Sequence, residues 1–195
     1  MFYLHGKKEG PTVDISMMNM FGKVFKTKRI DTLLATALEM PSIGNKYSVI
    51  FILPDCLSKT EDKISSINLD TVLDFTNSEI TVEHVAIPKF QVKSTCKLND
   101  PLKSLGIVTA FNESLANFNN ISDTNNLFIT LFFQKILIEF DEHGFLANST
   151  TAICMDSRGF SRKIEKFICN KPFFFIIRDN KTRSILFTCK VINPN

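Results

Sequence analysis

The sequence predicts an α+β protein that is built mainly from antiparallel β-sheets and carries a few short helices. Apolar runs such as residues 127–133 and 172–177 have the length of strands. The helical patterns are short and do not alternate with strands in a βαβ rhythm. Phe is unusually frequent, at 19 of 195 residues, whereas Tyr occurs twice and Trp is absent. Rings without a polar group favour the core of a sheet protein.

The first part of the chain carries two strand patterns followed by a helical one. Residues 24–40 contain alternating apolar positions and β-branched residues, and residues 46–55 form a continuous apolar run that predicts a buried strand. Ser58 and Glu61 have the spacing of a capping box, so we expect a helix to begin at Ser58. A second short helix is expected over residues 69–75.

The second part of the chain is richer in strands. Residues 79–98 predict one or two strands around Pro88. A short helix should follow, with Asn99 or Asp100 as its N-cap. Residues 127–140 read as one long strand. Three closing strands are expected at residues 163–169, 171–179 and 184–192.

Between the long strand and the first closing strand lies a segment without any regular pattern. Residues 144–162 show neither a helical period nor strand alternation. Loops of this length are uncommon in compact domains and are usually functional or disordered. The segment is therefore the main candidate for function.

Several classes of protein are disfavoured by composition and motifs. The net charge of +3 is too small to indicate binding to nucleic acid or to an anionic membrane. The chain contains no stretch of 18 apolar residues, and its first residues lack the features of a signal peptide. The five cysteines are scattered without a CxxC pattern, so we expect free thiols in mostly apolar surroundings and no metal or cofactor. No nucleophile or phosphate-binding motif occurs, and an enzyme is not expected.

Seven segments carry a likeness to one family, and they occur in that family's order. They are MM (17–18), ALEMP (37–41), IFILPD (50–55), IPKF (87–90), LKSLGIVTAF (102–111), ANFNNIS (116–122) and KPFFFIIRDNKTRSILFTCKVINP (171–194). On these segments the chain resembles the serpins, the serine protease inhibitors, over essentially its whole length. The resemblance implies a serpin-like fold for residues 1–195. It also implies an extracellular location, and an intracellular one stays open because the family includes members of both kinds.

The same resemblance assigns a role to the segment without a pattern. FDEHG (140–144) is similar to the serpin hinge, so Glu142 and Gly144, with Phe145 and Ala147, would form the hinge of a reactive-centre loop over about residues 144–162. The residue at the cleavage site of inhibitory serpins is the fourteenth after the hinge glycine.

Counting from the hinge glycine gives a cleavage site between Arg158 and Gly159. Arginine at this position implies a trypsin-like serine protease as partner, because the specificity pocket of such proteases carries an aspartate. The alternative, that Arg158 is a loop arginine without a role, stays open because Arg162 and Lys163 lie close by.

In serpins the cleaved loop enters the main sheet as a new strand, so alternate side chains must enter the core. One acceptable inward row is Ala147, Ser149, Thr151 and Ile153. Phe145 stands on the same parity, where inhibitory members carry Thr or Ser. Its bulk would slow insertion and favour simple cleavage of the loop, since overpacking costs about 1–3 kcal/mol.

The likeness begins in the middle of the family's fold, and the N-terminal helical half has no counterpart in the sequence. Three interpretations stay open: a fragment, a truncated non-inhibitory member, and a chain that needs another chain to complete the sheet. Without the missing neighbouring strand, residues 127–140 would present a bare apolar edge. The function implied is inhibition of a serine protease. The alternative is a non-inhibitory protein with a binding or structural role, or a protease substrate.

Overall fold

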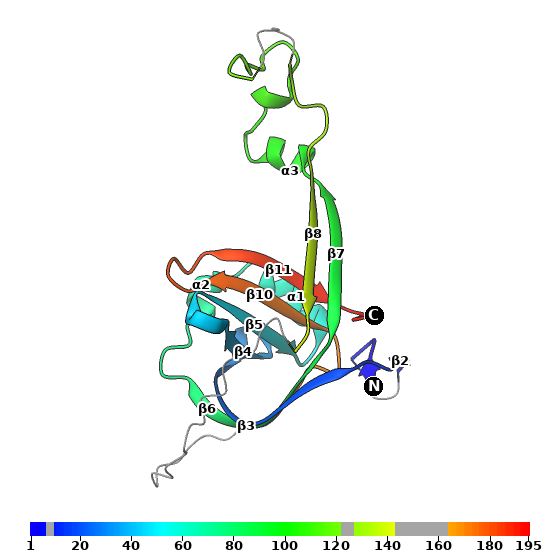
Figure 1. Ribbon diagram of the computed structural model, residues 1–195, viewed down its shortest axis with the longest axis vertical. Coiled ribbons are helices and arrows are strands. Elements are labelled where there is room, and N and C mark those ends of the chain that lie inside the picture. Colours follow the sequence, from blue (N-terminus) through cyan, green and yellow to red (C-terminus); the bar gives the residue numbers. More distant parts are fainter. Residues whose placement is uncertain (7–9, 122–126, 143–163) are drawn as a thin grey trace. The chain divides into compact units, whose positions relative to one another are not determined.

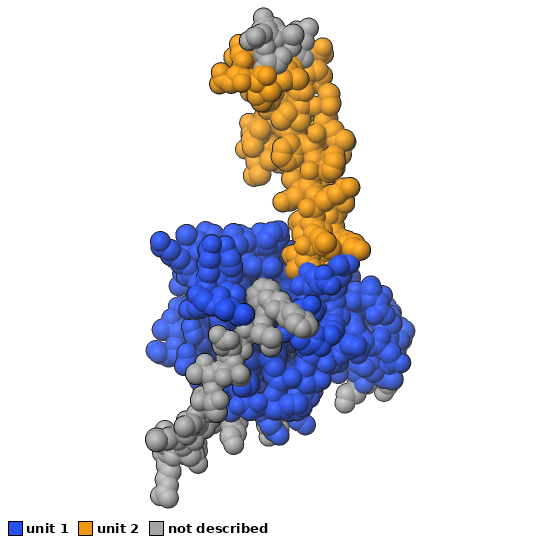
Figure 2. Space-filling model, viewed as in Figure 1, with its two compact units in different colours: residues 1–91, 139–195 blue, residues 92–138 orange. Residues whose placement is uncertain are grey.

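The computed structural model describes residues 1–6, 10–121, 127–142 and 164–195 (Figure 1). It divides into two compact units, one formed by residues 1–91 with 139–195 and the other by residues 92–138 (Figure 2). The predicted hinge and loop residues after Glu142, up to residue 163, lie outside the described residues.

The first unit is built on a seven-stranded sheet with the order β11-β10-β5-β4-β3-β6-β9. Its neighbours pair antiparallel except β6 and β9, which run parallel. The strands are β3 (Met17–Ile30), β4 (Ala35–Pro41), β5 (Tyr47–Pro54), β6 (Glu79–Pro88), β9 (Ile164–Ile168), β10 (Phe173–Asp179) and β11 (Ile185–Val191). A small antiparallel pair, β1 (Phe2–Tyr3) and β2 (Thr12–Val13), precedes them. The predicted mainly antiparallel sheet is confirmed.

Helices α1 (Leu57–Ile64) and α2 (Leu69–Val72) lie over one part of this sheet. Alternate residues of β4 and β5, including Ala35, Ala37 and Ile50, are fully buried in the core cluster there, and Ile64 packs against it. The three phenylalanines at 173–175 of β10 are all buried, as their apolar run predicts. Short 3-10 helices occur at Asp31–Leu33, Ile43–Asn45 and Thr109–Phe111.

Helix α1 does not begin as predicted. It starts at Leu57 with Cys56 as N-cap, and no side chain caps it, so Ser58 lies inside the helix. The buried hydroxyl of Thr60 instead donates to the carbonyl of Leu33 at 2.7 Å and to that of Cys56 at 3.1 Å. These bonds tie the helix to the end of the preceding 3-10 turn. The capping box was therefore a wrong interpretation.

A buried ion pair also stabilises the first unit. The guanidinium Nη2 of Arg178 lies 2.7 Å from Glu39 Oε1, and both side chains are less than one-tenth exposed. Arg178 Nη1 donates to the carbonyl of Leu73 at 3.0 Å, just beyond α2. One arginine thus joins the end of α2 to strands β4 and β10, which have β5 between them.

The second unit, residues 92–138, contains α3 (Asn99–Ser104) and most of the two-stranded sheet of β7 (Phe90–Lys97) and β8 (Phe133–Phe140). Residues 79–98 therefore form two strands, β6 and β7, with Lys89 between them. The unit buries little: Asn99 is the only side chain classed as buried among its described residues.

The predicted long strand over 127–140 is wrong in its first half, because β8 begins only at Phe133. The reason is Asn99, which does not cap α3 as predicted. Its amide donates to the carbonyl of Thr130 at 3.0 Å, and its side-chain oxygen accepts from the amide of Phe132 at 2.9 Å. The backbone amide of Ile129 donates to the carbonyl of Ala110 at 2.9 Å. These bonds occupy backbone groups that residues 129–132 would otherwise use to pair with a neighbouring strand.

The cysteine prediction is partly wrong. The four described cysteines are free thiols, but Cys56 and Cys96 are exposed and only Cys169 is buried. Burial raises the pKa of the Cys169 thiol far above its ordinary value, so this thiol is neutral. Within the described ranges, no group of acidic, His and Cys side chains is arranged to hold a metal. None of the described helices has the length and apolar character needed to cross a membrane.

Candidate functional site

Glu142 is the one predicted site residue that the structure describes. The other predicted hinge and cleavage residues, Gly144, Phe145, Ala147, Arg158 and Gly159, lie outside the described residues. Residues 141–163, between β8 and β9, are called the interval. The site is built from the two strands on either side of it: β8, which ends at Phe140, and β9, which begins at Ile164.

The first anchor is an aromatic cluster around Phe140. Strand alternation turns Phe140 inward at the end of β8, and the side chain is 2% exposed. Its ring stacks on Phe90 with centroids 4.7 Å apart and meets Phe175 edge-on at 5.0 Å. Phe51 and Phe173 complete the cluster. Edge-on and offset ring pairs of this kind add to the burial of apolar surface, so the strand is fixed just before the interval begins.

An ion pair follows two residues later. The carboxylate of Glu142 pairs with the ammonium of Lys89, which lies between β6 and β7. The Lys89 backbone is itself held, because its amide donates to the carbonyl of Ser16 at 2.8 Å. Both charged groups are roughly half exposed, so their contribution to stability is about 0–1 kcal/mol. The pair is better suited to fix the direction in which the chain leaves β8 than to stabilise the fold.

The second anchor is the parallel pairing of β9 with β6, in which Val85 lies opposite Phe167. Phe167 is 1% exposed. Beyond the strand, the amide of Cys169 donates to the carbonyl of Ala86 at 2.8 Å, and the carbonyl of Asn170 accepts from the amide of Tyr3 at the same distance. The chain is thus fixed again as soon as the interval ends.

Both anchors therefore use one short stretch of sequence, residues 82–90. Strand β6 holds β9, Lys89 holds Glu142, and Phe90 holds Phe140. Sequence reasoning missed Lys89, because a single lysine 53 residues from its partner leaves no local signal. The aromatic anchor could have been found, since Phe90 and Phe140 both belong to segments that carry the family likeness.

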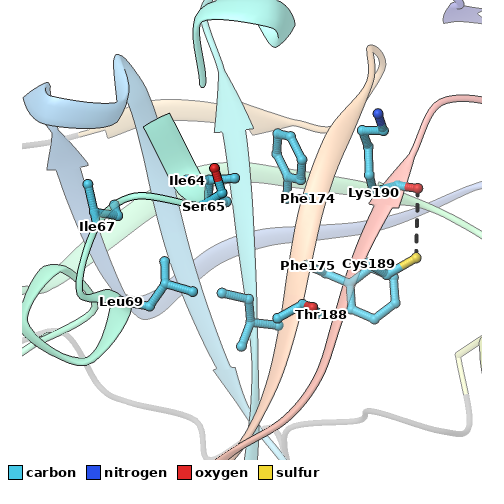
Figure 3. Close-up of a pocket in the computed structure, with 10 residues that line it drawn as sticks. Ile64, Ser65, Ile67, Leu69, Phe174, Phe175, Thr188, Cys189 and Lys190 are labelled. Atoms are coloured by element: carbon cyan, nitrogen blue, oxygen red, sulfur yellow. Dashed lines mark hydrogen bonds between the residues drawn. The ribbon is translucent and has the colours of Figure 1, made fainter. Parts of the chain in front are cut away.

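A separate pocket lies between the α1–α2 connection and strands β10 and β11 (Figure 3). Its volume is about 440 Å³. Ile64, Ile67 and Leu69 form one wall, and residues of β10 and β11, among them Phe174 and Thr188, form the other. The lining is mainly apolar, so the pocket suits an apolar molecule or side chain.

Lys190 is the one charged residue in that lining, and its ammonium is paired with the carboxylate of Glu61. The thiol of Cys189 lies 3.7 Å from the Lys190 carbonyl (Figure 3). These partners leave few polar groups to orient a ligand.

The fold and the anchors define a class of protein: a mainly antiparallel sheet protein in which a long interval joins strands of two different sheets. A family profile described as serpin (serine protease inhibitor) matches residues 2–194. The chain belongs to the serpin family. The predicted family membership and the predicted serpin-like α+β fold are confirmed.

Individual relatives agree with this assignment. Serpin B12 of Mus musculus is 32% identical over 190 residues, which cover 92% of this chain and 44% of that protein. Plasminogen activator inhibitor 1 of Bos taurus is 30% identical over 200 residues, covering 98% of this chain and 48% of that protein. A solved structure described as a tumour suppressing serpin superposes with a TM-score of 0.77 at 25% identity, covering 99% of this chain and 50% of that chain.

The chain thus spans about half the length of the relatives it matches. The prediction of a partial serpin domain is confirmed. The family is described as one of serine protease inhibitors.

Proposed function

We propose that this chain is the part of a serine protease inhibitor that offers a cleavable loop to a trypsin-like protease. The observation that carries the proposal is the family match over residues 2–194, which includes the whole interval between β8 and β9. The two anchors support it, because a bait must be held at both ends if it is to meet the protease in one conformation.

The chemistry follows from the sequence of the interval. The protease serine Oγ attacks the carbonyl carbon of Arg158, the bond to Gly159 breaks, and the new amine leaves with a proton. The product is an ester between Arg158 and the protease. The guanidinium of Arg158 pairs with the aspartate of a trypsin-like specificity pocket.

Inhibition further requires that the freed strand enter a sheet before water hydrolyses the ester. In the proposed mechanism, Glu142 and Gly144 act as the hinge, and Ala147 belongs to the inward row. The ion pair of Glu142 with Lys89 must open or follow this movement, and it is weak enough to do so.

A second candidate function is favoured by Phe145. A large ring at the first inward position slows insertion, and a protease then cuts the loop and leaves. The chain would be a protease substrate or a non-inhibitory member with a binding role. The extracellular location implied by the family resemblance stays a prediction.

The test is incubation of the chain with trypsin, followed by boiling in detergent and electrophoresis. A complex that survives boiling, and that Arg158→Ala abolishes while Arg162→Ala does not, supports inhibition at the proposed bond. Cleaved chain without a complex, with a new N-terminus at Gly159, supports the second candidate. Cleavage elsewhere contradicts the assignment of Arg158.

A further inference from the structure

Four asparagines of the chain stand in the pattern Asn-x-Ser/Thr, which marks an acceptor of N-linked glycans. They are Asn112, Asn120, Asn148 and Asn180. The structure describes the whole pattern for Asn112 and Asn180, whereas Ser122 and residues 148–150 lie outside the described residues. Glycan transfer needs two groups of the pattern to be accessible. They are the side-chain nitrogen of the Asn, which forms the new bond, and the hydroxyl two residues later, which the transferase binds.

The pattern at Asn180 has both of these groups occupied. The Asn180 Nδ2 donates to the carbonyl and to the side-chain oxygen of Asn45, each at 2.9 Å, and its Oδ1 is buried. The hydroxyl of Thr182 donates to the carboxylate of Asp179 at 3.0 Å, and the Thr182 amide donates to the same oxygen at 2.8 Å. A glycan on Asn180 would have to break the turn that joins β10 and β11.

The pattern at Asn112 has both groups free. Asn112, Glu113 and Ser114 are all exposed. The Asn112 Oδ1 accepts from the backbone amide of Ser114 at 2.9 Å, which fixes the side chain in an Asx turn without using its nitrogen. Among the residues that the structure describes, neither Asn112 Nδ2 nor the Ser114 hydroxyl has a hydrogen-bond partner.

The backbone around Asn112 is ordered and its surroundings are polar. The amide of Asn112 donates to the carbonyl of Thr109 at 3.1 Å, and the Asn112 carbonyl accepts from the amide of Ala116 at 2.9 Å. Six of the nine residues from 112 to 120 are polar and exposed: Asn112, Glu113, Ser114, Asn117, Asn119 and Asn120. A stretch of this composition faces water, because unpaired polar side chains are seldom buried.

We propose that Asn112 is an acceptor site for an N-linked glycan and that the fold excludes Asn180 from the same modification. The Asn112 Nδ2 attacks the anomeric carbon of a lipid-linked oligosaccharide. The bond from that carbon to the pyrophosphate oxygen breaks, the lipid pyrophosphate leaves with the bonding electrons, and Nδ2 gives up one proton. The bond from the Ser114 amide is kept, because Oδ1 takes no part in the transfer.

The proposal does not depend on the interval being a protease bait. In the cell it requires passage through the secretory pathway, which the extracellular location predicted from the resemblance would entail. The pattern alone favours the opposite site, since Thr in the third position makes a better acceptor than Ser. A preference for Asn112 would therefore come from the fold.

The test is incubation of the purified, folded full chain with oligosaccharyltransferase and a lipid-linked oligosaccharide, so that the result does not depend on location. Peptide N-glycosidase then releases the glycan and leaves Asp in place of each modified Asn, which mass spectrometry of peptides detects. Occupancy of Asn112 should exceed that of Asn180 about tenfold or more, because the groups of Asn180 must first leave their partners. Ser114→Ala should abolish transfer to Asn112, and Ser114→Thr should increase it.

A matched control frees the groups of the second pattern. The double variant Asn45→Gly with Asp179→Ala removes one acceptor of Asn180 Nδ2 and the acceptor of the Thr182 hydroxyl. Asn45 has a positive φ of 54°, so glycine suits its backbone. Occupancy of Asn180 should rise in this variant, and that of Asn112 should stay as in wild type.

Three results would overturn the proposal. One is a folded wild-type chain in which Asn112 carries no glycan. Another is an occupancy of Asn180 equal to that of Asn112. The last is a double variant, folded by circular dichroism, in which Asn180 remains as poor an acceptor as in wild type.

Discussion

Residues 92–138 and the rest of the described chain contain similar apolar side chains and bury them very differently. Among the residues that the structure describes, every buried apolar one belongs to the first unit, whereas ten of the sixteen exposed large apolar ones lie within residues 92–138. In the first unit each strand of the sheet from β10 to β6 has neighbours on both sides. The two-stranded β7–β8 sheet cannot enclose its own apolar faces. Burial in this protein follows the number of paired strands more than the local content of apolar residues.

The largest effect should come from a ring of the first unit. Phe175→Ala removes a fully buried side chain that contacts Phe90 and Phe140, and it should lower the free energy of unfolding by about 3–5 kcal/mol. The matched change in the second unit is Phe133→Ala, whose ring is 53% exposed and whose loss should change stability by about 0.5 kcal/mol or less. Urea unfolding of both variants measures the contrast. Equal losses would remove the distinction between the two units.

The ion pair of Glu39 and Arg178 should come next. Glu39→Leu leaves a buried guanidinium without its anion and should destabilise the first unit by about 3 kcal/mol. The double variant Glu39→Leu with Arg178→Met should recover most of the loss, because no charge is then buried alone. Thermal unfolding of the two variants checks this. A double variant as unstable as the single one would mean that the lost bond to the Leu73 carbonyl dominates.

A smaller and local effect is expected in the second unit from the buried side chain of Asn99. Asn99→Ala removes the bonds to Thr130 and Phe132, at a loss of about 1–2 kcal/mol. Hydrogen exchange should become faster at residues 98–132 and stay unchanged in β5 and β10. The control is Asn120→Ala at an exposed position. Faster exchange throughout the first unit would show that the two units unfold together.

The smallest effect concerns the turn after β10. The pKa of Asp179 is lowered because its carboxylate accepts from the backbone amide of Thr182, and also from the Thr182 hydroxyl and the Lys181 amide. A carboxyl with a lowered folded pKa stabilises the protein above its unfolded value of about 3.9, and this contribution is lost as pH falls through the folded pKa. Asp179→Asn should therefore flatten the decline of stability below about pH 4. An unchanged acid profile would contradict the assignment.

Strands β5 and β10 could be predicted from the sequence, because their long apolar runs leave few alternatives to burial. The single pattern over residues 24–40 did not show that β3 runs from Met17 to Ile30 and that a 3-10 helix separates it from β4. The roles of Ser58 and Asn99 could not be predicted from the sequence. A polar residue before an apolar stretch has the same local pattern whether it caps a helix or bonds to a distant carbonyl, and the choice depends on which chain lies nearby. Thr60 and Asn99 each bond to backbone at least 27 residues away.

The candidate site likewise has one part that the sequence could predict and one part that depends on the fold. The sequence around Glu142 could be matched to the serpin hinge by its likeness to the family, and the hinge role of Glu142 stays a prediction. Its partner Lys89 could not be predicted, since contact between them depends on the fold. The assignments of Gly144, Phe145, Ala147, Arg158 and Gly159 rest on sequence and stay predictions.

The segment after the interval contributes strands at both margins of the seven-stranded sheet: β9 next to β6 at one side, and β10 and β11 next to β5 at the other. A nick anywhere between β8 and β9 would therefore leave two polypeptides interlocked by backbone hydrogen bonds in two separate places. Such a nicked molecule should migrate as a single species on a native gel and separate into two only in denaturant, so cleavage alone would not release the C-terminal piece.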